Sequence, residues 1–127
     1  MSYHRRALNR RARQRERRKL RQATWECVRW ALATFPDETI TQQAIHLTKE
    51  ALELEASLAT GRDGGAGEEL ADVYMLGRLI THRVEALARR AGVDLAQALL
   101  LKLTVNRGRT WARTAEGHYQ HVRGPRS

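Results

Sequence analysis

This sequence of 127 residues has a single cysteine and no long apolar run, and these two features limit the kinds of protein it can be. The one cysteine, Cys27, cannot form a disulfide within the chain, which is consistent with a reducing cytoplasm. No run of about 18 apolar residues is present to span a membrane, and the N-terminus lacks the apolar core of a secretory signal peptide. We therefore expect a cytoplasmic protein with no membrane partner.

Positive charge is concentrated at the N-terminus, in residues 1–21, which we call the basic arm. This segment holds ten basic side chains and one acid, Glu16, so it carries the whole formal net charge of +9. Such a run repels itself, and we expect it to be disordered or a frayed helix. It can contact the phosphates of nucleic acid without sequence preference, or it can be a solvated tail, because charge alone gives affinity and no specificity.

The rest of the chain, residues 22–127, is predicted to be one helical domain. Charges of the two signs balance there, and apolar residues recur at spacings of three and four, which is typical of amphipathic helices. No alternating strand pattern is present, so we predict an all-α protein, a four-helix bundle with an Arg-rich N-terminal extension. The predicted helices cover about 22–34, the stretch from 37–41 to about 59, about 68–91 and about 95–109.

Residues with known roles at helix ends define these boundaries. They are Pro36 after the first helix, Asp37, Thr39 or Thr41 before the second, the glycines of a flexible link over 61–67, Gly92 as a C-cap, and Asp94 with Gln97 as a capping box. The fourth helix is apolar on most sides, and we expect it to be the most buried.

Two pairs of carboxylates are the main candidates for a chemical site. Glu50 and Glu53 are three residues apart on the second predicted helix, and Glu69 and Asp72 are three apart on the third, so each pair shares a helix face. Each of the four acids stands directly before an apolar residue, so both pairs are rotated to the same side of the apolar face of their own helix. A short link favours antiparallel helices, and in antiparallel neighbours the two pairs would lie on the same side of the helix pair. Four carboxylates suit Mg²⁺ or Mn²⁺. The alternative is that they are ordinary solvated positions.

A polar stripe marks the otherwise apolar fourth helix. Lys102, Asn106 and Arg109 are spaced by four and three residues and therefore share a face. Lys and Arg match phosphate oxygens, and Asn can bind a sugar hydroxyl or a phosphate. The alternative is a polar edge of the bundle.

These three motifs together resemble the MazG-like all-α nucleoside triphosphate pyrophosphohydrolases. The resemblance covers roughly residues 25–123 and rests on the segments from Lys49 to Leu54, from Glu68 to Val73 and from Lys102 to Trp111. The stretch from Trp30 to Trp111 is similar to a phage and bacterial subgroup thought to act on dATP and dGTP. The basic arm lies outside this pattern.

The resemblance implies a metal-dependent hydrolase that cleaves between the α- and β-phosphates and releases a nucleoside monophosphate and pyrophosphate. It implies that Mg²⁺, or Mn²⁺, is held by Glu50, Glu53, Glu69 and Asp72, and that Lys102, Asn106 and Arg109 bind the substrate. Relatives are dimers or tetramers, and a phage-encoded member would act in the host cytoplasm. The alternative is a nucleic-acid-binding helical protein without catalysis, which would use the basic arm.

Candidates for a base pocket are aromatic and amide side chains, because aromatic faces stack on bases and amides read base edges. They are Trp30, Phe35, Gln43, His46 and Tyr74. The alternative is core packing, which we favour for Trp30.

Overall fold

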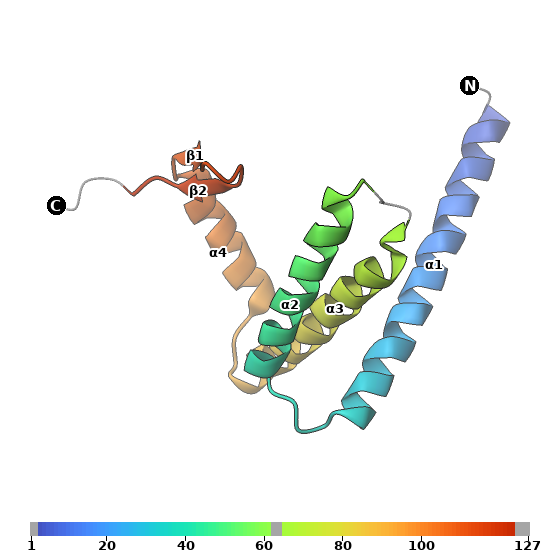
Figure 1. The fold of residues 1–127 in the computed structure, drawn as a ribbon, viewed down its shortest axis with the longest axis horizontal. Helices are drawn as coiled ribbons and strands as arrows, with labels where there is room; N and C mark the ends of the chain where they lie inside the picture. Colours follow the sequence, from blue (N-terminus) through green and yellow to red (C-terminus); the bar gives the residue numbers. More distant parts are fainter. Residues whose placement is uncertain (1–2, 62–64, 124–127) are drawn as a thin grey trace. The chain divides into compact units, whose positions relative to one another are not determined.

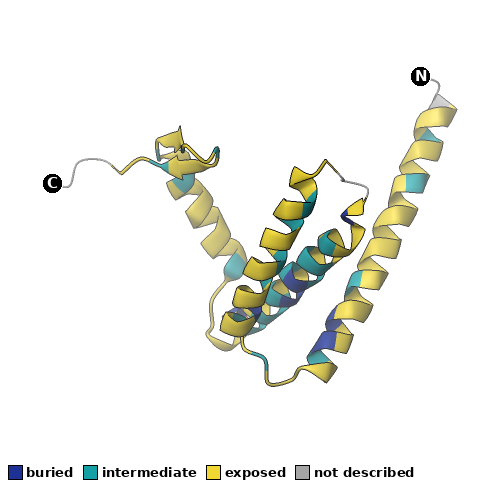
Figure 2. Cartoon of the chain, in the orientation of Figure 1, coloured by how far each residue is buried: buried dark blue, intermediate teal, exposed yellow. Residues whose placement is uncertain are grey.

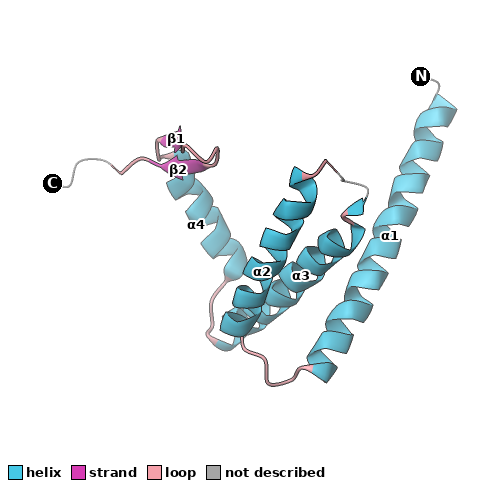
Figure 3. Ribbon diagram, in the orientation of Figure 1, coloured by secondary structure: helices cyan, strands magenta, loops and turns pink. Residues whose placement is uncertain are grey.

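The computed structural model describes residues 3–61 and 65–123, and this part of the chain is mainly helical, as predicted (Figure 1, Figure 3). The elements are α1 (Tyr3–Thr34), α2 (Ile40–Ala59), α3 (Gly67–Arg90), α4 (Leu95–Arg107), β1 (Trp111–Arg113) and β2 (Tyr119–His121). The chain divides into two compact units, Met1–Val84 and Glu85–Ser127, and α3 passes through the boundary.

The first unit begins with α1, which includes the described part of the basic arm. Residues 3–21 are helical and continuous with the helix expected over about 22–34. The helix ends where Pro36 requires it to, because the residue before a proline is disfavoured in the helical region. The last helical turn is closed by the Phe35 amide, which donates to the Ala31 carbonyl at 2.8 Å.

The core of the first unit lies between the second half of α1 and the middle of α3. Val28 and Ala31 from α1 and Leu79 from α3 form one buried cluster, and Leu32 packs against it (Figure 2). Close to this cluster, the rings of Trp25 and His82 are 6.0 Å apart. The core is small, so α1 is held in the unit by its C-terminal half.

α2 and α3 run antiparallel, and the segment that joins them lies at one end of both (Figure 1). α2 begins at Thr39, one of the three predicted caps, in a reciprocal capping box. The Gln42 amide donates to Thr39 Oγ1 at 3.1 Å, and the Thr39 amide donates to Gln42 Oε1 at 2.9 Å. Residues 62–64 of the predicted flexible link lie outside the described part of the chain.

The second unit confirms two predicted helix signals. Gly92 has a φ of 69° after α3, in the left-handed region that favours glycine, and the Val93 amide donates back to the Ala88 carbonyl at 2.9 Å. The Asp94 side chain then accepts from the Gln97 amide at 3.1 Å and caps α4.

Two expectations about the second unit were wrong. α4 was expected to be the most buried helix, but none of its residues is buried, and Leu99, Leu100 and Leu101 are 63%, 65% and 62% exposed. It ends at Arg107 with Gly108 as its C-cap, within two residues of the predicted end. After it comes an unpredicted antiparallel hairpin of β1 and β2, in which Trp111 pairs with His121.

No helix in the described residues is long and apolar enough to cross a membrane.

Candidate metal and nucleotide site

Glu50 on α2 is the centre of the candidate site. Its side chain is only 15% exposed, and its Oε1 lies 3.2 Å from Nε2 of His46, one helical turn earlier. Its Oε2 is buried and has no hydrogen-bond partner in the structure. A buried carboxylate oxygen without a partner is costly, and either a hydrogen-bond donor or a cation would satisfy it.

The electrostatics around Glu50 point the same way. Burial raises the pKa of the Glu50 carboxyl above its ordinary value, and the negative charges of Glu53 and Asp72 raise this pKa further. The hydrogen bond with His46 lowers it. The charge of Asp72 on α3 therefore reaches Glu50 on α2.

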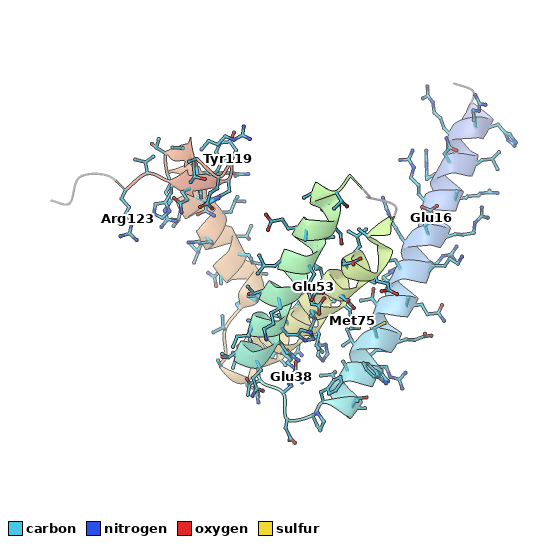
Figure 4. The ribbon with its side chains drawn as sticks, viewed as in Figure 1. Glu16, Glu38, Glu53, Met75, Tyr119 and Arg123 are labelled. Carbon is cyan, nitrogen blue, oxygen red and sulfur yellow. The ribbon has the colours of Figure 1, made fainter. Side chains whose placement is uncertain are left out.

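The four predicted acids are brought together in part. Glu53 is exposed on α2, on the side of α3 (Figure 4), and Asp72 on α3 is half-buried. Glu69 is also half-buried, but it lies one turn nearer the start of α3 than Asp72 does. Within residues 3–61 and 65–123, no three His, Cys, Asp or Glu side chains are close enough together to hold a metal ion.

The residues nevertheless fit a divalent cation in charge and in donor type. Carboxylate oxygens are the ligands that Mg²⁺ and Mn²⁺ prefer, and Glu50 carries an oxygen that lacks a partner. Like charges in a poorly solvated region repel each other and spread apart. A bound cation would offset that repulsion.

Other predicted site residues of the first unit lie on three segments. Trp30, near the end of α1, meets Phe35 edge to face at 5.4 Å, and these side chains are 55% and 43% exposed, so Trp30 is not simply a core residue. Tyr74 on α3 is exposed as well. Gln43 on α2 is fully buried, and neither polar atom of its amide has a hydrogen-bond partner.

The predicted phosphate-binding residues belong to the second unit. Lys102 is exposed on α4, whereas Asn106 and Arg109 are half-buried. Arg109 Nη1 lies 3.5 Å from Asn106 Oδ1, and the Trp111 indole donates to the Asn106 carbonyl at 2.9 Å. The end of α4 and the start of β1 therefore hold Asn106 and Arg109 in place.

Sequence reasoning missed two contacts around the site. It treated His46 as a base contact, although its spacing of four from Glu50 on one helix could have shown the pairing. It also gave Arg83 no role. Arg83 Nη2 donates to the Phe35 carbonyl at 3.4 Å, and its Nε is buried without a hydrogen-bond partner. No spacing in the sequence indicates that contact, because it joins residues 48 positions apart.

Comparison with known proteins gives one family. A model of the dATP/dGTP pyrophosphohydrolase family matches residues 23–125. The dATP/dGTP diphosphohydrolase of Salmonella phage PMBT28 is 39% identical over 93 residues, which are 73% of this chain and 28% of the relative. The protein of the same name from Cyanophage S-2L is 39% identical over 56 residues, 44% of this chain and 47% of the relative. This chain thus spans less than half the length of either relative.

One solved structure is similar along most of the chain. It is the Cyanophage S-2L MazG-like pyrophosphohydrolase, bound to dGDP and three catalytic Mn²⁺ ions per active site. The sequence identity is 32% and the TM-score is 0.55, over 81% of this chain and 91% of the other.

Replacing Glu50 tests the electrostatics of the site. A raised pKa means that ionisation of Glu50 opposes folding, so its effect is absent below the ordinary glutamate range and grows as the pH rises through the raised pKa. In chelator at neutral pH we therefore expect Glu50→Gln to melt at a higher temperature than the wild type. Mn²⁺ should raise the melting temperature of the wild type by much more than that of Glu50→Gln.

The matched control is Glu55→Gln, the same change at an exposed position of the same helix. It should respond to Mn²⁺ as the wild type does. Equal Mn²⁺ shifts in the wild type and Glu50→Gln would show that Glu50 holds no cation.

Proposed function

The chain belongs to the dATP/dGTP pyrophosphohydrolase family, and from that premise we propose that it hydrolyses dATP and dGTP. Water attacks the α-phosphorus, the bond from this phosphorus to the oxygen that bridges the α- and β-phosphates breaks, and the products are the deoxynucleoside monophosphate and pyrophosphate. The observation that carries the proposal is the family match over residues 23–125, within which Glu50 carries a buried, unpartnered oxygen beside two other acids.

The four acids Glu50, Glu53, Glu69 and Asp72 would hold the metal. A bound divalent cation, Mg²⁺ in the cell with Mn²⁺ as a substitute, supplies charge for the triphosphate and lowers the pKa of a bound water. The solved relative contains Mn²⁺, which supports a divalent metal of this class. One of the four carboxylates would accept the proton of the attacking water.

The substrate contacts follow from side-chain chemistry. Lys102 and Arg109 bind phosphate oxygens, and Asn106, which faces Arg109, binds a phosphate or the sugar. Trp30, Phe35, His46 and Tyr74 are exposed in the structure and offer ring faces or edges for the base. Gln43 adds an amide that can donate to and accept from a purine edge once neighbouring side chains move aside.

We also propose that the active protein is a homo-oligomer, a dimer or tetramer that works in the host cytoplasm, where triphosphates are available. α4 exposes Leu99, Leu100 and Leu101, and large apolar areas on a protein surface usually mark an interface. Sedimentation at micromolar concentration should give a mass at least twice that of the 14.5 kDa chain. A monomer under those conditions would contradict this part of the proposal.

The alternative function is a nucleic-acid-binding protein without catalysis, in which the four acids would have no catalytic role. Nucleic acid stays in the proposal as an additional partner of the basic arm, because the arm precedes the family region. It does not replace the hydrolase.

Turnover tests the main proposal. Purified protein with Mg²⁺ or Mn²⁺ should release pyrophosphate from dATP and dGTP. Glu53→Gln removes one carboxylate of the metal-binding group, and several kcal/mol of transition-state stabilisation depend on a bound metal. We therefore expect kcat/KM to fall by roughly 100-fold or more, while Glu55→Gln keeps wild-type turnover. Absence of turnover on every common triphosphate would refute the hydrolase, and full activity of Glu53→Gln would refute the site.

Gln43→Met tests the role of the buried amide, because Met has a similar size and no strong hydrogen-bonding group. Removal of two unpartnered polar atoms should raise the melting temperature, since each unsatisfied buried group costs about 1–3 kcal/mol. If the amide reads the base, kcat/KM for dATP should fall about tenfold, the loss of roughly 1.4 kcal/mol. Turnover of dCTP, where measurable, should not change. Unchanged turnover of dATP would leave Gln43 with no part in substrate binding.

A further inference from the structure

The basic arm has a charge that the family region does not explain. The arm covers residues 1–21, whereas the family match begins at residue 23. All of the formal net charge of +9 belongs to the arm, and the remaining residues are neutral overall. Binding a nucleotide therefore does not require this charge, and the arm needs a polyanionic partner of its own.

The arm is helical, and its charges surround the helix axis. One row consists of Arg6, Arg10, Arg13 and Arg17, at spacings of four, three and four. A second row consists of Arg11, Arg15 and Arg18, with Lys19 beside it. Arg11 follows Arg6 by five residues, so the rows lie about 140° apart around the axis. All eight side chains are exposed.

The surface of the helix shows the same two faces. Asn9 and Gln14 join the four arginines of the first row to line a shallow hollow of about 400 Å³. On another side, Arg15, Glu16, Arg18 and Lys19 help to line a hollow of about 490 Å³. A helix that is basic on only one face fits a flat anionic surface, but one that is basic all round fits between two anionic walls.

Three other polyanions fit this arrangement poorly. A helix that lies on a membrane needs an apolar face, and the larger aliphatic residues of the arm, Leu8 and Leu20, are twelve positions apart on a helix without one. Single strands are bound largely by stacking on successive aromatic rings, and Tyr3, at the very start of the arm, is its one aromatic residue. The major groove of duplex RNA is too narrow and deep for side chains to read.

We infer that residues 3–21 of α1 lie in the major groove of duplex DNA, with arginines of both rows on the phosphates of the two groove walls. The groove is about 12 Å wide, and a helix with its side chains is about 10–12 Å across. The 19 residues extend over roughly 28 Å, about one turn of the duplex. The contacts are to phosphates, so binding is independent of sequence and steeply dependent on salt.

The test uses two charge-removal variants of the full chain. One replaces Arg6, Arg10, Arg13 and Arg17 with Gln, and the other replaces Arg11, Arg15, Arg18 and Lys19 with Gln, a good helix former. Affinity for a labelled duplex is measured by fluorescence anisotropy between roughly 50 and 200 mM KCl. Each variant should lose four phosphate contacts, and the slope of log K against log salt should therefore fall by about three to four in both.

A body variant with Arg78, Arg89, Arg90 and Arg123 replaced by Gln removes the same charge from exposed positions and should keep the wild-type slope. Circular dichroism should show the arm variants to be as helical as the wild type, and their dATP turnover should be unchanged, which separates this inference from the hydrolase proposal. A single strand and duplex RNA of the same sequence, and phosphatidylserine vesicles, are measured in parallel.

Three results would overturn the inference. If only one row lowers the slope, the helix lies on a flat surface and not in a groove. If vesicles, the single strand or duplex RNA bind more tightly than duplex DNA, the partner is wrong. If the body variant loses as much slope as the arm variants, attraction by net charge explains the binding and the arm is not a specific interface.

Discussion

The candidate site depends on one constraint, which is that the packing of α2 against α3 brings the charge of Asp72 near enough to the poorly solvated carboxyl of Glu50 to raise its pKa. Glu50 cannot relieve this by turning toward solvent, because its carboxyl is largely buried and Oε2 has no partner. The protein can protonate the group, which is what the raised pKa expresses, or it can bind a cation. A cation held by these acids would remove the cost of the buried charge, and His46, whose Nε2 lies 3.2 Å from Glu50 Oε1, would help to orient the carboxylate.

The small core of the first unit packs the second half of α1 against α3. Val28, Ala31 and Leu79 fix the second half of α1 against α3, and Arg83 links α3 to the turn after α1. These contacts lie toward the C-terminal part of α3, whereas Asp72 and Glu69 lie toward its start. Glu69 and Asp72 are themselves half-buried, so they lie outside this cluster but are not freely solvated.

Local chemistry made the helix boundaries predictable, and tertiary context made the rest unpredictable. Thr39, Gly92 and Asp94 act within one turn of their own positions, so the sequence alone indicates their roles. The short strands β1 and β2 were missed because three residues are too few to show alternation. The burial of Gln43 and the exposure of α4 depend on which other segments cover them, and residue type misleads in both cases.

The distribution of charge along α1 argues against a role of the whole basic arm in capturing the nucleotide. Val28, where α1 joins the core, follows Arg13 by fifteen residues, roughly 22 Å along the helix axis. At physiological salt, charges are screened over about 8 Å. The arginines from Arg5 to Arg13 therefore contribute little to the potential beside Val28. A partner that extends along the helix, such as a polymer with regularly spaced phosphates, would meet all of them.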